Sequence, residues 1–180
     1  IEADLRVAER VHRSMIPRSG RRGPLDVACH FDPTDGVGGD YASVFFQTDH
    51  RVVATVCDVT GHGIAAALLA SRVSSFVLNA TAEAAHPCEV GDALNAFVCE
   101  HFQESGLLLT FFCLFLDLEH RCLRYSGFGH PPALLRKPSG EVLPFHSENP
   151  IIGLEREMTR SCSMLSVPFE PGDRLVLYTD

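Results

Sequence analysis

The chain has 180 residues, of which 46% are apolar, so it can bury one good core but is too short for two full domains. Its formal net charge of −8 argues against a surface for nucleic acid or anionic membranes, because both need a positive patch. The longest apolar stretch, Leu107 to Leu118, is broken by Thr110 and Asp117 and is shorter than the roughly 20 residues that span a bilayer. We therefore expect one globular domain and no membrane segment.

The first residues, Ile1 to Asp4, lack both an initiator Met and the basic-then-apolar pattern of a signal peptide. This start predicts a fragment of a longer protein. Seven cysteines without a secretory signal, with Cys29, Cys57 and Cys113 inside apolar runs, predict buried, reduced thiols and a cytoplasmic location. A structural zinc site has little support, because no C-x-x-C pair is present.

Residues 1–15 predict a helix that ends before Pro17. Its apolar residues at positions 1, 5, 8 and 15 follow heptad spacing, with His12 in the remaining slot. The pattern fits a coiled coil with a second copy and a single amphipathic helix packed on the domain equally well. We divide the chain into a regulatory or linker helix at residues 1–17, a solvated, arginine-bearing linker at residues 18–24, and one domain at residues 25–180.

A strand hairpin is predicted near the start of this domain. Residues 25–31 alternate as in a half-buried strand, and residues 41–48 and 51–58 read as two strands joined by a tight turn. Asp40 precedes the first strand of this pair, and Asp58 ends the second. Antiparallel pairing would bring both carboxylates to the same edge of the sheet.

Two helices and a further set of strands follow the hairpin. Apolar residues recur with helical period from Ile64 to Val77 and from Val90 to Phe102. Strand-like runs then occupy residues 108–118, 121–127, 133–136, 141–145, 159–167 and 173–179. This order predicts an α+β fold of antiparallel sheets with helices packed outside, since most connections have hairpin length.

Three acidic signatures mark points where an apolar run meets a turn: Gly38-Gly39-Asp40, Asp58 to Gly63, and Leu175 to Asp180. Each one alone could be a turn, a helix cap or a strand end. Three carboxylates that converge without a cation would repel one another and raise their pKa values, so a divalent metal explains them economically. All-oxygen ligands favour Mg²⁺ or Mn²⁺, and the chemistry we infer is metal-assisted phosphate hydrolysis.

Six motifs in order resemble the bacterial SpoIIE/RsbU-type PP2C phosphatases over essentially the whole chain. They are Leu5 to Pro17, Val37 to Tyr41, Asp58 to Gly63, Gly127 to Pro132, Asn149 to Gly153 and Pro171 to Asp180. The resemblance implies a PP2C-like antiparallel β-sandwich flanked by helices, in α-β-β-α order, that is incomplete at its C-terminal strands. It also implies two Mn²⁺ or Mg²⁺ ions in a cleft at one sheet edge.

The resemblance implies metal-ligand roles for four residues of this chain. Asp58 would bridge both ions, the backbone carbonyl of Val59 would complete the ligand set, and Asp40 and Asp180 would be further ligands, Asp40 directly or through water. In the family mechanism, a water held between the metals attacks phosphorus in line without a phosphoenzyme. The chain also lacks the thiol-phosphatase, P-loop, H-E-x-x-H and G-x-S-x-G motifs.

Four other positions carry expectations. His130, before two prolines, would shape the cleft floor, either as a structural residue or as a donor to phosphate or the leaving group. His62 would lie in the first turn of the following helix, and the general-acid role is not transferred to it. Ser43 stands where family members often have a second Asp and would alter the surroundings of the ligands, while Phe128 replaces a usual Ala and would narrow the cleft.

These observations lead to a cytoplasmic, metal-dependent protein serine/threonine phosphatase domain, regulated through its N-terminal helix. The resemblance implies a phosphorylated STAS-domain substrate, the anti-anti-sigma factor of a partner-switching pathway, and an upstream sensor domain in the parent chain. A homodimer through the N-terminal helix is one option. The rival interpretation is a pseudophosphatase that binds such a protein without hydrolysis, and a third is a hydrolase of cyclic nucleotides or small phosphates.

Overall fold

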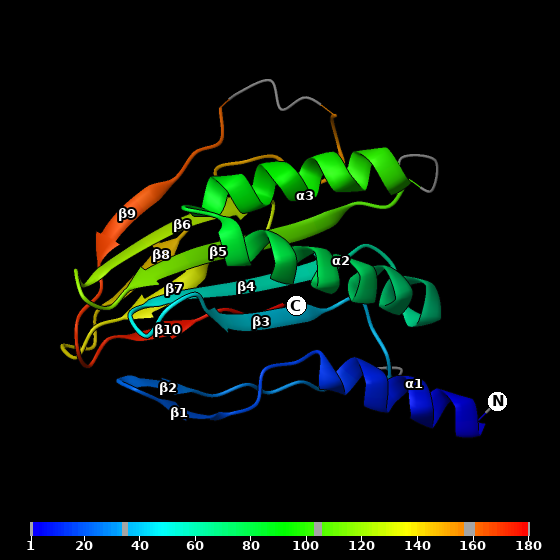
Figure 1. Cartoon of the computed structure of the whole chain (residues 1–180), viewed down its shortest axis with the longest axis horizontal. Coiled ribbons are helices and arrows are strands. Elements are labelled where there is room, and N and C mark those ends of the chain that lie inside the picture. Colours follow the sequence, from blue (N-terminus) through cyan, green and yellow to red (C-terminus); the bar gives the residue numbers. More distant parts are fainter. Residues whose placement is uncertain (1, 34–35, 103–105, 157–160, 180) are drawn as a thin grey trace.

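The computed structural model describes residues 2–33, 36–102, 106–156 and 161–179, and it has an α+β architecture (Figure 1). In chain order the elements are α1 (Glu2–Ser14), β1 (Gly20–Arg22), β2 (Leu25–Val27), β3 (Tyr41–Phe46), β4 (Arg51–Val59), α2 (Gly63–Glu83), α3 (Pro87–Phe102), β5 (Leu109–Asp117), β6 (Cys122–Phe128), β7 (Ala133–Arg136), β8 (Val142–Phe145), β9 (Leu165–Pro168) and β10 (Arg174–Val176). The predicted fold class and most predicted elements are confirmed.

Two antiparallel sheets form the body of the domain. The larger has the strand order β3-β4-β5-β6-β9, and the smaller has the order β10-β7-β8. An apolar core joins them face to face: Val52, Phe112 and Leu114 of the larger sheet belong to the same buried cluster as Leu135 and Phe145 of the smaller one. The sheets therefore form the sandwich that the resemblance implies.

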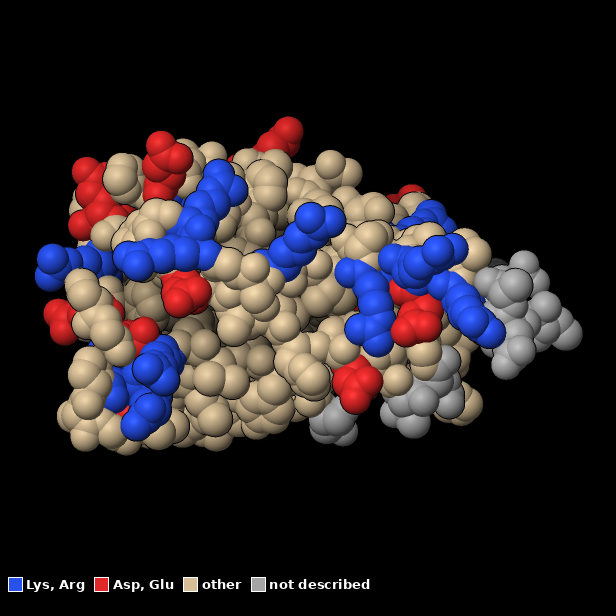
Figure 2. All heavy atoms as spheres, turned by 90° about the horizontal axis from the view of Figure 1, so that it is seen from below, with Lys and Arg blue, Asp and Glu red and all other residues tan. Residues whose placement is uncertain are grey.

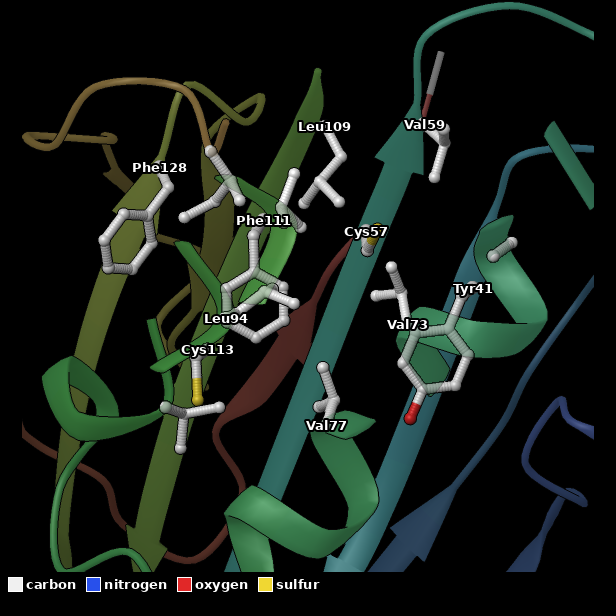
Figure 3. Close-up of a cluster of buried hydrophobic side chains, with 14 of the residues drawn as sticks. Tyr41, Cys57, Val59, Val73, Val77, Leu94, Leu109, Phe111, Cys113 and Phe128 are labelled. Carbon is white, nitrogen blue, oxygen red and sulfur yellow. The ribbon is translucent and has the colours of Figure 1, made fainter. Parts of the chain in front are cut away.

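Helices α2 and α3 cover the other face of the larger sheet (Figure 1). Their buried residues recur at helical spacing, as Leu69, Val73 and Val77 do on α2. These side chains pack against Cys57, Phe111 and other residues that point from the sheet toward the helices (Figure 3). Because both faces of β4 and β5 are covered, every residue from Val52 to Cys57 is buried.

Among the described residues, α2 is the one helix long and apolar enough to cross a membrane by length and composition alone. A core helix passes the same test, and α2 packs on β3, β4 and α3. We therefore interpret α2 as a helix that buries one face in the core of the domain.

The N-terminal part differs from its prediction. Residues 18–24 were expected to be a linker, but Gly20–Arg22 pairs with Leu25–Val27 in an antiparallel hairpin. The guanidinium of Arg22 lies 4.0 Å from the ring centre of Phe46, and this cation–π contact fastens the hairpin to β3. The strand predicted at residues 25–31 is observed only at Leu25–Val27, because only this first part pairs with another strand.

Helix α1 touches the domain through its C-terminal half. His12 is buried, and the sulfur of Met15 accepts a hydrogen bond from Ser74 of α2 at 3.3 Å. Val7, Ala8 and Val11 remain exposed. The C-terminal part of the heptad stripe, at His12 and Met15, is thus used for docking, as in the packed-helix alternative.

Arginine is concentrated in this N-terminal part, where all six arginines of residues 6–22 are exposed. Figure 2 looks at the face made by α1 and the β1–β2 hairpin, and it shows basic groups separated by acidic and uncharged ones. The arginines do not merge there into one continuous basic surface.

The cysteines also differ in part from the expectation of reduced, buried thiols. Cys88 at the start of α3 and Cys162 before β9 form a disulfide, although 74 residues separate them in sequence. Cys57, Cys99 and Cys113 are free and buried, as expected, whereas the free Cys29 and Cys122 are half-buried. The expectation of reduced thiols fails for these two cysteines because they meet only in the folded chain. No spacing between neighbouring cysteines in the sequence indicates such a pair.

Candidate active site

Asp40 and Asp58 lie opposite each other at the open end of the β3–β4 hairpin. Tyr41 pairs with Cys57 in the antiparallel register, so the next pair outward is Asp40 with Asp58. Both side chains are half-buried. The predicted meeting of these two carboxylates at one sheet edge is confirmed.

The two carboxylates point toward the interior between the sheets. Side chains alternate along a strand, and Asp58 lies two residues after Val56, which packs in the core between the two sheets. Cys57, which lies between Val56 and Asp58 in the sequence, points to the helix side of the sheet. Burial is the largest cause of the raised pKa of the Cys57 thiol, and the negative charges of Asp58 and Asp40 raise it further. The charge of both aspartates therefore acts on this thiol.

Gly39 lets the backbone of Val59 approach closely. The backbone N–H of Val59 donates to the carbonyl of Gly39 at 3.3 Å. A β-carbon on residue 39 would lie 2.6 Å from the carbonyl oxygen of Val59, closer than such atoms come. The glycine of the Gly38-Gly39-Asp40 motif therefore leaves space beside the carbonyl that the resemblance identifies as a ligand.

The donor chemistry of this edge fits a hard divalent cation. Two opposed carboxylates and a backbone carbonyl, from Asp40, Asp58 and Val59, are oxygen ligands of the kind that Mg²⁺ and Mn²⁺ prefer. Asp180, the remaining predicted ligand, lies outside the described residues. Within those residues, no three side chains of His, Cys, Asp or Glu are grouped as a metal site.

Helix α1 reaches this edge through His12, which is 2% exposed. Burial lowers the pKa of His12, and the backbone and negative charge of the neighbouring Asp40 oppose that shift. Neither ring nitrogen has a hydrogen-bond partner with ordinary geometry in the described part of the chain. The ring packs edge-on against Phe31, with centroids 5.1 Å apart. The N-terminal helix thus lies near a candidate ligand.

A second polar group adjoins the site through Thr110 of β5, which is paired in register with Asp58. The Oγ1 of Thr110 lies 2.7 Å from Nδ1 of His130, and Nε2 of His130 lies 3.0 Å from the backbone oxygen of Tyr178. We call this arrangement of Thr110, His130 and Tyr178 the His130 bridge. His130 is 5% exposed, and these contacts favour the structural alternative expected for it.

The loop of the Asp58 to Gly63 motif is fixed by Thr60. Its backbone N–H and its hydroxyl both donate to the carbonyl of Leu108, at 2.9 and 3.0 Å. His62 follows as the N-cap residue of α2, one position before the first turn in which it was expected, and its side chain makes no capping hydrogen bond.

Two expectations about the surroundings of the site are wrong. Ser43 lies on the helix-facing side of β3, opposite to Asp40, and its hydroxyl is 2.7 Å from that of Thr55. Phe128 is fully buried and packs in the helix-side core against α3, where Gly91 leaves room for its ring (Figure 3). Neither residue lines the edge that carries Asp40 and Asp58.

Sequence reasoning missed Thr110, Ser147 and the role of Thr60. Ser147 accepts a hydrogen bond from the backbone N–H of His130 at 3.0 Å and donates to its carbonyl at 2.7 Å. All three are ordinary polar residues in sequence, and only the folded chain shows their partners. The Thr60 contact had a signal, since the residue lies inside the Asp58 to Gly63 motif.

Comparison with known proteins gives consistent matches. A family model described as Stage II sporulation protein E (SpoIIE) matches residues 48–180. The chain is 25% identical over 180 residues to phosphoserine phosphatase RsbP and 21% identical over 182 residues to phosphoserine phosphatase RsbU, both from Bacillus subtilis. These matches cover 98% and 100% of the chain but only 44% and 53% of the relatives, so the chain spans about half their length.

Solved structures agree with the observed fold. The SiaA-PP2C domain of Pseudomonas aeruginosa matches with a TM-score of 0.78 and 19% identity, over 97% of this chain and 69% of that one. A structure of RsbX in complex with magnesium matches with a TM-score of 0.62 and 18% identity, over 77% of this chain and 64% of that one. At these identities, the likeness shows the PP2C fold alone.

Proposed function

The chain belongs to the SpoIIE family, and from this premise we propose that it is a metal-dependent protein serine/threonine phosphatase domain. The observation that carries the proposal is the opposition of Asp40 and Asp58 at the end of one hairpin, beside the carbonyl of Val59. Both relatives are named phosphoserine phosphatases, which supports phosphoserine as the residue whose phosphate ester is hydrolysed.

Asp40, Asp58, the carbonyl of Val59 and Asp180 would hold two Mn²⁺ or Mg²⁺ ions. When bound, such ions activate water as a nucleophile and neutralise charge on the phosphoryl group. The RsbX structure with magnesium supports this choice of ion for the fold.

The chain's own residues contribute mainly by positioning. Asp58 lies within β4, which has a partner strand on each side, so its carboxylate is held by a stiff element. Gly39 leaves space beside the carbonyl of Val59, and Thr60 anchors the loop that follows to Leu108. Cys57 points to the helix side, away from this edge, so its thiol is not placed to form a phosphoenzyme in place of water.

The partners follow from the family and belong to the same proposal. The substrate would be a phosphorylated STAS-domain protein of a partner-switching pathway that controls a sigma factor, and an upstream sensor domain would act through α1. The contact of His12 with the surroundings of Asp40 supports this route of control, because moving α1 would disturb a ligand. The exposed residues Val7, Ala8 and Val11 support pairing of α1 with a second copy.

A pseudophosphatase that binds the same protein without hydrolysis is the second candidate. It is favoured by Ser43 in place of a family Asp, but Ser43 lies on the far face of the sheet from Asp40. That position gives the substitution no direct route to the ligands. We therefore rank hydrolysis first.

The test combines calorimetric Mn²⁺ titration with turnover of a phosphoserine protein, in the full-length parent protein. Asp58→Asn should abolish turnover and weaken Mn²⁺ binding more than Asp40→Asn, because Asp58 is the expected bridging ligand. Asp49→Asn, in the turn at the opposite end of the same hairpin, is the matched control and should change neither. Binding of the phosphoprotein without turnover at saturating Mn²⁺ would favour the pseudophosphatase.

A further inference from the structure

The His130 bridge connects the two sheets beside the candidate site. His130 lies in the connection from β6 of the larger sheet to β7 of the smaller one. Its ring contacts Thr110, which is paired with Asp58, and Tyr178, which follows β10 of the smaller sheet. One buried imidazole therefore joins a residue adjacent to Asp58 to the chain that leads to Asp180.

The partners define the proton on the ring. A backbone carbonyl can only accept, so Nε2 carries a proton and donates to Tyr178. Nδ1 lies 2.7 Å from the hydroxyl of Thr110, which can donate or accept, so both ring nitrogens are engaged. Ser147 fixes the backbone of His130 through both its N–H and its carbonyl, so the bridge has a rigid base.

The reach of the bridge matters because Asp180 follows Tyr178 by only two residues. Fixing the carbonyl of Tyr178 holds the segment after β10 beside Thr110, the residue paired with Asp58. We propose that His130 is a positioning residue that sets the separation between the Asp40–Asp58 edge and the segment after β10, which contains Tyr178 and precedes the proposed ligand Asp180 in sequence. This inference rests on the proposed function, in which these three carboxylates share a metal centre.

Residues that orient metal ligands without touching the metal typically change metal affinity by about 10- to 100-fold when they are replaced. Two variants separate the ends of the bridge. In His130→Gln, the amide nitrogen replaces Nε2 and can still donate to Tyr178. In His130→Asn, the shorter side chain can still reach Thr110, as Nδ1 does, but cannot reach Tyr178.

Mn²⁺ affinity, measured by calorimetry on the full-length protein, is the first readout. His130→Asn should weaken binding by about tenfold or more, and His130→Gln should remain near the wild type. Val90→Ala is the control for lost stability, since Val90 is buried on the helix side of the larger sheet and should leave the affinity unchanged. Equal affinity in wild type and His130→Asn would overturn the inference, as would equal losses in Asn, Gln and control variants.

Hydrogen exchange of residues 174–179 in metal-free protein is the second readout. Exchange should be faster in His130→Asn than in wild type or His130→Gln, because only the Asn variant releases Tyr178. If the wild type binds no Mn²⁺, the proposed function fails, and the exchange rates alone then decide whether His130 holds this segment. Unchanged exchange in His130→Asn would refute the bridge itself.

Discussion

The carbonyl oxygen of Val59 lies 2.6 Å from the position that a β-carbon on Gly39 would occupy. The obstacle is backbone inside a paired strand, so it cannot swing away as the end of a side chain could. Residue 39 is consequently restricted to glycine by packing. The same contact places the motif around Asp40 against the motif around Asp58, which are 18 positions apart in sequence.

We predict that Gly39→Ala separates the two motifs and weakens Mn²⁺ binding, with a loss of about 1–3 kcal/mol in the free energy of unfolding. Gly38→Ala is the matched control, because a β-carbon there would meet its nearest atom at 3.8 Å, an ordinary contact. Chemical denaturation and Mn²⁺ titration of both variants test the prediction. If the two variants behave alike, the close approach does not constrain the site.

Phe128 is predicted to stabilise the helix-side core without affecting the metal centre. Replacing a buried Phe with Ala costs about 3–5 kcal/mol, so Phe128→Ala should lower the free energy of unfolding strongly while Mn²⁺ affinity in the folded protein stays unchanged. Thermal unfolding and calorimetry provide the two readouts. A change in affinity at intact fold would restore the interpretation in which Phe128 lines the site.

The contact of Phe128 with Gly91 gives a separate prediction. Alanine is favoured over glycine in a helix by about 1 kcal/mol, but a β-carbon on Gly91 would overlap the ring of Phe128, which is fully buried. Gly91→Ala should therefore destabilise the fold. Adding Phe128→Leu should recover part of the loss, and simple additivity in the double-mutant cycle would contradict the contact.

The sequence predicts elements with strong periodicity and fails where both faces of a strand are buried. The hairpin that brings Asp40 and Asp58 together could be predicted, because each strand is an apolar run that ends at a carboxylate. The face of Phe128 could not, since the last four residues of β6, Tyr125 to Phe128, are all buried and show no alternation. The His130 bridge could not be predicted either, as it depends on tertiary contacts between residues 20 and 48 positions apart.

Thiol counting tests the disulfide. The denatured, unreduced protein should show five reactive thiols, and reduction should reveal all seven, as counted by alkylation and mass spectrometry. In the native protein, Cys57 and Cys113 should label last, because burial both shields these thiols and raises their pKa values, which lowers the reactive thiolate fraction. Seven thiols before reduction would show that Cys88 and Cys162 are unpaired in solution.

Helix α1 provides the last prediction, which concerns control of the site. Val7 and Val11 are 49% and 56% exposed on one side of α1, while His12 of the same helix is buried beside Asp40. If the exposed side pairs with a second copy, the pairing and the position of His12 are coupled through one rigid helix. Val7→Asp combined with Val11→Asp should then shift the protein toward monomer in ultracentrifugation and change the phosphatase rate at fixed Mn²⁺.

Arg6→Gln combined with Arg10→Gln is the matched control. It changes the net charge by the same two units in the same direction, on exposed residues of the same helix. A general charge effect would therefore act in both double variants, whereas loss of an apolar contact would act only in the valine pair. If the valine variant keeps the oligomeric state and rate of the wild type, with its helix content intact by circular dichroism, α1 does not transmit a signal through this side.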